Sequence, residues 1–175
     1  MDAQLGYILH RGTSLDRALL VKFMQRTYEE LYPGETFAHL AQTVDQYFSS
    51  ETPLWWAEVA PAESSPAPSH LNQLSSSETR QRSNSTALIG CLWLGIAVDQ
   101  VTGHRYSHIF LLYVAPAYRR RGVGSALMHH AEAWAKARGD QQIGLQVFQH
   151  NQPALQLYEK LGYRPQSVWM VKPIL

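Results

Sequence analysis

The chain has 175 residues, 45% of them hydrophobic, which suffices for one globular domain with a sizeable core. Fifteen basic and fourteen acidic side chains leave a formal charge of +1, so the composition does not predict bulk electrostatic binding to nucleic acid or to an anionic membrane. The single cysteine, Cys91, excludes an internal disulfide, and no Cys/His spacing predicts a metal site.

The first sixty residues predict a strand, two helices and a second strand. Residues 6–11 suggest the first strand, and a capping box at residues 13–16 opens a helix that ends before Pro33-Gly34. Residues 36–48 predict the second helix, and the apolar run at 54–60 predicts the next strand.

Residues 61–86 differ in composition from the rest of the chain. These 26 positions hold eight serines and three prolines. Such a segment buries too little apolar surface to offset its ordering entropy, so we expect a flexible insertion between two strands, within one domain over 1–175. A surface loop is the favoured interpretation, although long loops are sometimes lids.

Two strongly apolar strands follow. Residues 87–98 predict one, residues 99–103 predict a turn, and the near-continuous apolar run at 107–114 predicts a strand covered on both faces. Pro116 ends it. A helix then opens at Gly122-Val123-Gly124 and ends near Gly139.

The three arginines before these glycines predict an anion site. The first N–H groups of a helix lack internal partners and lie at the positive end of its dipole, and glycine lets a diphosphate approach the main chain. A dinucleotide fingerprint would need a third glycine where Ala126-Leu127 stand, and a Walker loop would need Gly-Lys-Ser/Thr. An ordinary strand–helix turn with solvated arginines remains the alternative.

A second motif follows a strand-like stretch at 141–148. It reads Asn151-x-x-Ala-x-x-Leu-Tyr158-x-x-Leu-Gly-Tyr163 on the next helix. Together with Arg119-x-x-Gly-x-Gly124, it resembles the GNAT family of acetyl-CoA-dependent N-acetyltransferases, from about His108 to the C-terminus. The first hundred residues resemble the family only in the order of their elements.

The resemblance implies an α/β (α+β) fold with a central mixed, mostly antiparallel sheet of six to seven strands and about four helices. With a final strand near 167–172, the order is β-α-α-β-β-β-α-β-α-β. A V-shaped splay is expected between the fourth and fifth strands. The start of the chain has no basic and apolar leader pattern and no segment approaches a membrane span, so we expect a cytoplasmic protein without a membrane partner.

The family's cofactor-binding positions transfer to this chain residue by residue. The resemblance implies acetyl-CoA as co-substrate, with no metal. The strand segment that matches the family's pantetheine-pairing backbone is Leu112, Tyr113, Val114. The loop that matches its pyrophosphate site is Arg119, Arg120, Arg121, Gly122, Val123, Gly124, Ser125. Two further positions lie on the following helix, Asn151 and Tyr158. Asn151 also suits the N-cap of its helix.

Tyr158 stands where the family has its general-acid tyrosine, seven residues after Asn151, so the resemblance implies that role. A phenol with pKa ~10 stays protonated at neutral pH and can donate to the leaving sulfur. An apolar helix stripe would instead make it a core aromatic. For the base, the ribosomal-protein branch has a glutamate where this chain has Gln146, and the histone-acetylating branch has one at His108. His108 is thus a candidate general base, or a histidine without a catalytic role.

The acceptor is an amine of undetermined identity, on a small molecule or on a protein lysine or N-terminus. Weaker candidates for the general base on the acceptor side are Glu29, Glu30 and Glu58. Four aromatic residues either line an acceptor pocket or belong to the core: Tyr28, Tyr32, Trp55 and Trp56. The alternatives to acetyl transfer are another acyl-CoA substrate and a non-catalytic CoA-binding regulatory module. The family often dimerises, so a homodimer is expected as well.

Overall fold

The structure is a computed structural model that describes residues 6–60 and 87–174; the insertion expected at 61–86 lies outside the described residues. Five strands form one sheet in the order β1-β2-β3-β4-β5, antiparallel except for the parallel pair β4–β5. The strands are β1 (Tyr7–Arg11), β2 (Leu54–Val59), β3 (Leu88–Val98), β4 (Arg105–Val114) and β5 (Ile143–Leu145).

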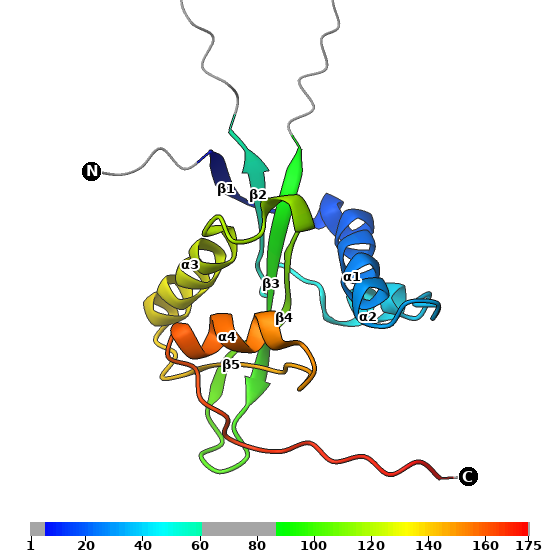
Figure 1. Ribbon diagram of the computed structural model, residues 1–175. Helices are drawn as coiled ribbons and strands as arrows, with labels where there is room; N and C mark the ends of the chain where they lie inside the picture. The colour runs from blue at the N-terminus through cyan, green and yellow to red at the C-terminus, as the bar shows by residue number, and fades with distance from the viewer. Residues whose placement is uncertain (1–5, 61–86, 175) are drawn as a thin grey trace, which may run out of the picture.

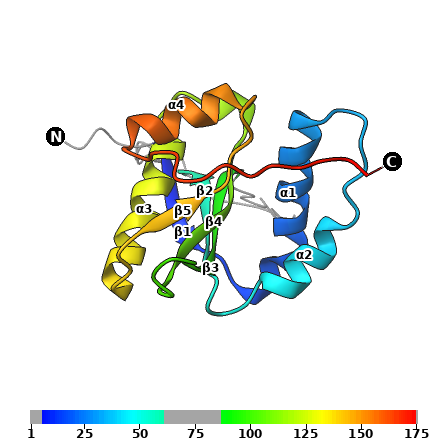
Figure 2. The same cartoon turned by 90° about the horizontal axis from the view of Figure 1, so that it is seen from below.

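Helices cover both faces of this sheet. They are α1 (Arg17–Leu31), α2 (Leu40–Tyr47), α3 (Val123–Arg138) and α4 (Gln152–Lys160), with single 3₁₀ turns at Ser14–Asp16 and Pro116–Tyr118. Figure 1 shows α1 and α2 on one side and α3 on the other, with α4 crossing in front of β5. Seen from below in Figure 2, the sheet lies between the two helical layers.

Each side of the sheet has its own apolar core. Trp56 and Trp93, both fully buried, pack under α1 and α2, whereas Trp55 packs against α3 around the fully buried Leu127. Alternation along β2 therefore sends its two neighbouring tryptophans to opposite cores. The core alternative for Trp55 and Trp56 is the one that the structure supports.

β4 carries an extra residue at its centre. Leu111 pairs with Trp93 and Ile109 pairs with Leu94, so Phe110 has no partner on β3. A bulge of this kind bends its strand and increases the local twist. The three pairs that join β4 to β5 end at Ile109, directly before the bulge. β4 then continues to Val114 without a strand beside it on the β5 side, as far as the described residues go.

The expected α/β fold is confirmed, with a smaller sheet of five strands instead of six or seven. β5 covers only residues 143–145 of the predicted 141–148, because β4 bends away beyond Ile109. The final strand predicted at 167–172 is wrong for this structure. Those residues are exposed and pair with no described strand, so their strand-like composition has no ladder to join.

Candidate functional site

The loop between β4 and α3 turns sharply through two left-handed residues. Arg120 has φ 63° and Gly122, which precedes the first residue of α3, has φ 84°. Left-handed residues in such a loop turn backbone N–H groups toward one concavity, the geometry of an anion nest. A Cβ built on Gly122 would meet no atom within 4 Å, so the space beside this residue is open.

The N-terminus of α3 adds donors to the same place. The first helical hydrogen bond runs from the Ala126 N–H to the Gly122 carbonyl at 2.9 Å. The N–H groups of Val123, Gly124 and Ser125 come earlier and have no intrahelical acceptor. They therefore suit an oxyanion beside the open space at Gly122.

Gly124 is the point where three segments meet. A Cβ on Gly124 would lie 3.3 Å from Cδ2 of Leu157 on α4 and 3.8 Å from Cγ2 of Val114 on β4. Glycine lets α3 approach both elements at this point. The arginine–glycine motif and the motif that begins at Asn151 thus approach each other at Gly124 and Leu157, which are 33 positions apart in the sequence.

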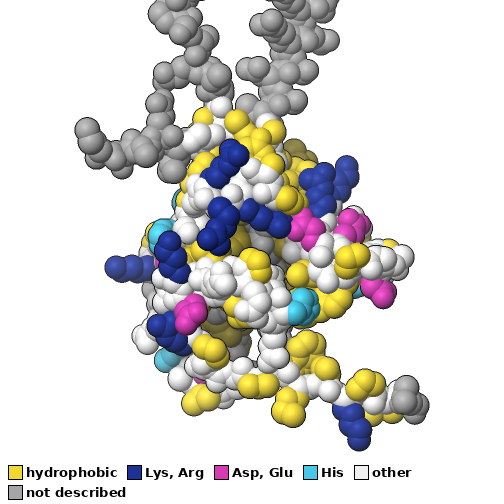
Figure 3. Space-filling view, in the orientation of Figure 1, with side chains coloured by type: hydrophobic (Ala, Val, Ile, Leu, Met, Phe, Trp, Pro, Cys, Tyr) yellow, Lys and Arg dark blue, Asp and Glu magenta, His cyan; other side chains and the backbone are white. Residues whose placement is uncertain are grey.

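The three arginines have different surroundings. Arg119 donates from Nε to the Val114 carbonyl at 2.7 Å and forms an ion pair with Glu30 of α1. Glu30 also accepts a hydrogen bond of 3.1 Å from the Tyr113 hydroxyl. Arg120 and Arg121 are exposed. In Figure 3 basic side chains gather over the loop between β4 and α3, and acidic ones lie beside them.

Arg119 therefore links the loop to β4 and α1. Arg121 places its guanidinium over the ring of Tyr118 at 5.5 Å, and the exposed Arg120 is accessible to solvent or to a ligand. Burial is the main cause that raises the pKa of Tyr113, and the nearby Glu30 carboxylate adds to it. The link from Glu30 to the loop has no local signal in the sequence, because 89 residues separate Glu30 from Arg119.

The segment Leu112–Val114 lies on the last part of β4, beyond the bulge. One edge of this segment pairs with β3, where Leu112 lies opposite Leu92 and Val114 lies opposite Gly90. The Tyr113 side chain packs among the core residues under α1, whereas Leu112 and Val114 pack toward α3. The edge that faces away from β3 is the open one, and it runs directly into the arginine loop.

Tyr158 lies on α4 and packs against the core on the α3 side of the sheet. Burial raises the pKa of its phenol to about 12, so the hydroxyl keeps its proton at neutral pH. Asn151 begins the same helix, with its side-chain oxygen accepting from the Ala154 N–H at 3.3 Å. Asn151 is therefore a helix cap in this structure, and Pro153 follows it in the first turn.

His108 lies where β4 and β5 are still paired. It is half-buried opposite Gly144, with the rings of Tyr106 and Phe110 at 6.3 and 5.6 Å. Its Nδ1 is buried and has no hydrogen-bond partner among the described residues. Burial lowers the pKa of this imidazole, so it is neutral at pH 7 and its free nitrogen is a proton acceptor or donor according to tautomer.

The remaining base candidates are placed less favourably. Glu58 on β2 pairs with His10 on β1 at 3.3 Å, two strands away from β4. Glu30 is held by Arg119 and Tyr113, as described above. Glu29 is exposed on α1, and Gln146 is exposed after the end of β5.

Aromatic side chains from three segments meet beside the end of β5. Tyr28 of α1 and Tyr32, directly after the end of α1, lie edge-on to Phe148 at 6.3 and 5.4 Å, and His150 stacks on Phe148 at 5.6 Å. Phe37 of the α1–α2 loop joins Tyr28 at 5.6 Å. We call these five residues the aromatic cluster. The sequence indicated only the two tyrosines, because Phe148 and His150 follow a strand that ends earlier than predicted.

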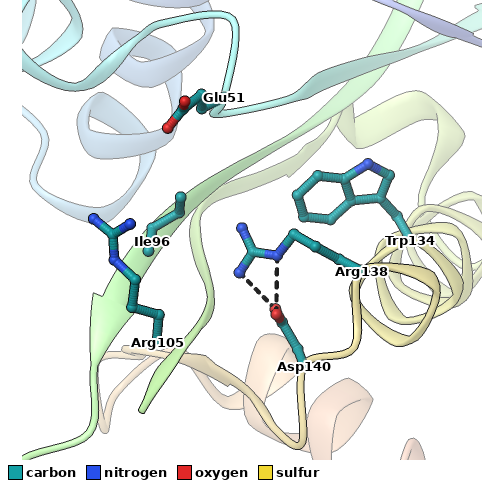
Figure 4. A pocket seen from close by; sticks show the side chains of 6 residues that line it. All are labelled: Glu51, Ile96, Arg105, Trp134, Arg138 and Asp140. Carbon is teal, nitrogen blue, oxygen red and sulfur yellow. Dashed lines mark hydrogen bonds and ion pairs between the residues drawn. The ribbon is translucent and has the colours of Figure 1, made fainter. Parts of the chain in front are cut away.

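The hollow shown in Figure 4 lies elsewhere, at the other end of β3 and α3. It has a volume of about 440 Å³ and is lined by Glu51, Ile96, Arg105, Trp134, Arg138 and Asp140. Asp140 accepts hydrogen bonds from Arg138 and from the hydroxyl and N–H of the buried Ser107. Burial alone would raise the pKa of Asp140, but these hydrogen bonds outweigh it and lower the pKa. Asp140 thus fixes β4 to the end of α3.

Two features are absent from the part of the chain that the structure describes. Its His, Cys, Asp and Glu side chains form no group of three that could hold a metal ion. None of its helices is long and apolar enough to cross a membrane.

Comparison with known proteins gives a consistent result. The model of the Acetyltransferase (GNAT) family matches residues 42–163. An uncharacterized N-acetyltransferase of Methanocaldococcus jannaschii is 31% identical over 78 residues, which are 45% of this chain and 33% of the relative. The matched segments cover 26% to 57% of the length of four curated relatives, so the chain corresponds to only a part of them.

Solved structures share the fold over nearly the whole chain. A candidate acetyl transferase from Pyrococcus furiosus superposes with a TM-score of 0.69 at 24% identity, covering 96% of this chain and 99% of that one. AAC(6')-Iy in complex with the bisubstrate analogue CoA-S-monomethyl-acetylneamine has a TM-score of 0.60 at 16% identity, covering 96% and 99%. At these identities the likeness concerns the fold.

Proposed function

Because the chain belongs to the GNAT family of acetyltransferases, we propose that it transfers the acetyl group of acetyl-CoA directly to a primary amine. The observation that carries this proposal is the loop before α3, where an open glycine, free helix N–H groups and exposed arginines adjoin an unpaired edge of β4. That combination suits a long ligand with a phosphate group at one end and amides along its length.

The residues present fit coenzyme A. The N–H groups of Val123, Gly124 and Ser125 would hold the pyrophosphate, with Arg120 and Arg121 adding charge. The open edge at Leu112–Val114 would pair with the amides of the pantetheine arm. Acetyl-CoA supplies an activated thioester carbonyl; the protein must position the amine, keep it neutral and stabilise the departing sulfur.

Deprotonating the amine is the largest of these demands. An alkylamine with pKa ~10.4 is almost entirely protonated at pH 7, which costs about 4–5 kcal/mol to reverse. His108 is neutral at that pH, and its Nδ1 has no hydrogen-bond partner in the part of the chain that the structure describes, so it is our candidate acceptor of this proton, directly or through water. Its place at the base of the open edge, before the bulge, is compatible with this role.

Tyr158 is our candidate donor to the sulfur. A phenol with a pKa of about 12 stands well above an ordinary thiol at about 8.5, so complete proton transfer to a thiolate is uphill by about 5 kcal/mol. Tyr158 therefore acts mainly by donating a hydrogen bond as negative charge develops on sulfur. The proton that ends on the thiol comes from the amine.

The acceptor would enter beside the aromatic cluster. Tyr32 and Phe148 are 37% and 36% exposed, so their rings remain accessible at the surface. Ring faces attract the apolar part and the positive charge of an alkylammonium ion. We therefore extend the proposal to amines on an apolar or cationic carrier, on a small molecule or on a protein.

Two measurements on the full chain test the proposed function. Thermal unfolding with acetyl-CoA, CoA and longer acyl-CoAs should show a rise in apparent stability with CoA ligands, because a ligand that binds only the folded state stabilises it. Thiol release across a panel of amines and peptides should then show acceptor-dependent turnover.

The outcomes separate the alternatives. No thermal shift with any CoA at saturation refutes the cofactor assignment. A shift without thiol release from any amine favours a non-catalytic CoA-binding module. A larger shift and faster turnover with a longer acyl-CoA corrects the acyl group while leaving the transfer reaction in place.

A further inference from the structure

Glu30 lies near the end of α1 and joins this helix to two parts of the candidate cofactor site. Its Oε2 pairs with Nη2 of Arg119 in the loop before α3, and its Oε1 accepts a hydrogen bond of 3.1 Å from the hydroxyl of Tyr113 on β4. Arg119 also places its guanidinium over the ring of Tyr113, at 5.9 Å from the ring centre. The three side chains therefore contact one another, and each comes from a different segment.

The ion pair positions the loop more than it stabilises the fold. The side chains of Arg119 and Glu30 are 44% and 37% exposed, and ion pairs at that exposure contribute little to the free energy of unfolding. Arg119 has a second contact, because its Nε donates to the Val114 carbonyl at 2.7 Å. One guanidinium thus ties the loop to both β4 and α1.

The other charged side chains in the last turns of α1 make no such link. Arg26 places its guanidinium over the ring of Phe23 at 5.3 Å and forms no ion pair with another described residue. Glu29 is exposed and is equally without an ion pair in the part of the chain that the structure describes. The carboxylate that contacts the cofactor segments is therefore that of Glu30.

The same end of α1 also carries part of the aromatic cluster. Tyr28 and Tyr32 stand two residues before and after Glu30, and both rings lie edge-on to Phe148. Positions two apart on a helix do not face each other, so this end of α1 contacts the cofactor segments and the aromatic cluster with different sides. In Figure 2 the end of α1 and α4 lie at the same end of the molecule.

We propose that Glu30 is a positioning residue that couples the cofactor site to the acceptor site. A ligand that orders the loop before α3 fixes Arg119, and Arg119 fixes the end of α1 through Glu30. When one ligand orders a segment, a second ligand that uses this segment has less ordering to achieve. Acetyl-CoA thus prepares the aromatic cluster for the amine, and the amine strengthens the binding of acetyl-CoA by the same factor.

This inference rests on the proposed function, because it requires a CoA ligand at the loop. Hydrogen exchange of the full chain with and without saturating CoA tests it in the absence of any amine. In the parent protein CoA should slow exchange at residues 119–126, beside the ligand, and also at residues 28–32. The slowing at residues 28–32 should be at least about fivefold, the lower end of ordinary coupling between two sites.

Glu30→Gln removes the charge that pairs with Arg119 but keeps an oxygen that can accept from Tyr113. CoA should still slow exchange at residues 119–126 in this variant, whereas the effect at residues 28–32 should fall below about twofold. Tyr113→Phe removes the other contact of Glu30 and should give an intermediate effect. The matched control is Glu29→Gln, which removes the same charge from the neighbouring position and should respond to CoA as the parent does.

The possible results separate this coupling from the cofactor assignment. Slowing at residues 119–126 alone in the parent would overturn the coupling and leave the cofactor assignment in place. Equal slowing at residues 28–32 in the parent and in Glu30→Gln, or equal losses in Glu29→Gln and Glu30→Gln, would overturn the role of the Glu30 contacts. No slowing at either segment of the parent would overturn the cofactor assignment and the coupling together.

Discussion

Gly95→Ala tests whether the bulge at Phe110 is built as the structure shows. A Cβ on Gly95 would lie 1.9 Å from Cε2 of Phe110, whereas non-bonded carbons need about 3.5 Å, so the ring or the strand must move by about 1.6 Å. The ring is confined by Trp93 at 4.9 Å, Tyr47 at 5.5 Å and His108 at 5.6 Å. Overpacking of this kind destabilises a fold by about 2–3 kcal/mol.

Urea unfolding followed by tryptophan fluorescence measures this loss. The control is Gly6→Ala, where the added Cβ meets nothing within 4 Å, and its free energy of unfolding should stay within about 0.5 kcal/mol of the parent. In a Phe110→Ala background the loss from Gly95→Ala should fall by at least about 1 kcal/mol, because the two sites are in contact. A loss below about 0.5 kcal/mol, or one unchanged in that background, would refute the reasoning.

Three further predictions concern the candidate site. Tyr158→Phe should lower kcat about 10- to 1,000-fold with little change in acetyl-CoA affinity, since it removes only a donor; unchanged turnover with rate-limiting chemistry would exclude its role. His108→Gln should reduce the free energy of unfolding that is lost between pH 7.5 and 5, because the pKa of His108 is lower in the folded state than the ~6.5 of the unfolded state, so acid favours unfolding. Urea unfolding at both pH values measures this loss, and equal losses in parent and variant would contradict the burial of His108. Arg120→Ala and Arg121→Ala should each raise the KM for acetyl-CoA at low salt without lowering the melting temperature. Arg119→Ala should lower the melting temperature by a few degrees, because it removes the contacts to Val114 and Glu30. Identical behaviour of all three variants would contradict the structural role of Arg119.

The parts of the site that could be predicted from sequence depend on local backbone chemistry. Gly122 is left-handed before a helix, and Asn151 caps one, because these conformations are determined within a few residues. The order of elements follows from the same local signals. Residues 167–172 have the composition of a strand, but none of the five strands in the described residues pairs with them, so local composition alone predicted a strand that the structure does not form.

The parts that could not be predicted depend on contacts between distant segments. The bulge at Phe110 is a matter of register between β3 and β4, and its sequence has the same apolar pattern as an uninterrupted strand. The ion pair of Glu30 with Arg119 joins residues 89 positions apart. Both features shape the site, since the bulge opens the β4 edge and the ion pair fixes the first arginine of the loop.

Burial shifts the two candidate proton-transfer groups in opposite directions and leaves both uncharged. The pKa of His108 is lowered and that of Tyr158 is raised to about 12, because low dielectric disfavours an imidazolium and a phenolate alike. Burial around either group also disfavours an ammonium ion beside it, so the acceptor should react as the neutral amine. We therefore expect kcat/KM to rise with pH toward the pKa of the amine, and to show no alkaline fall through pH ~10, where an ordinary tyrosine titrates. The profile should be measured with two amines of different pKa. Its rise should follow the amine, and a fall near pH 9 that Tyr158→Phe abolishes would show that this phenol titrates too early to be buried.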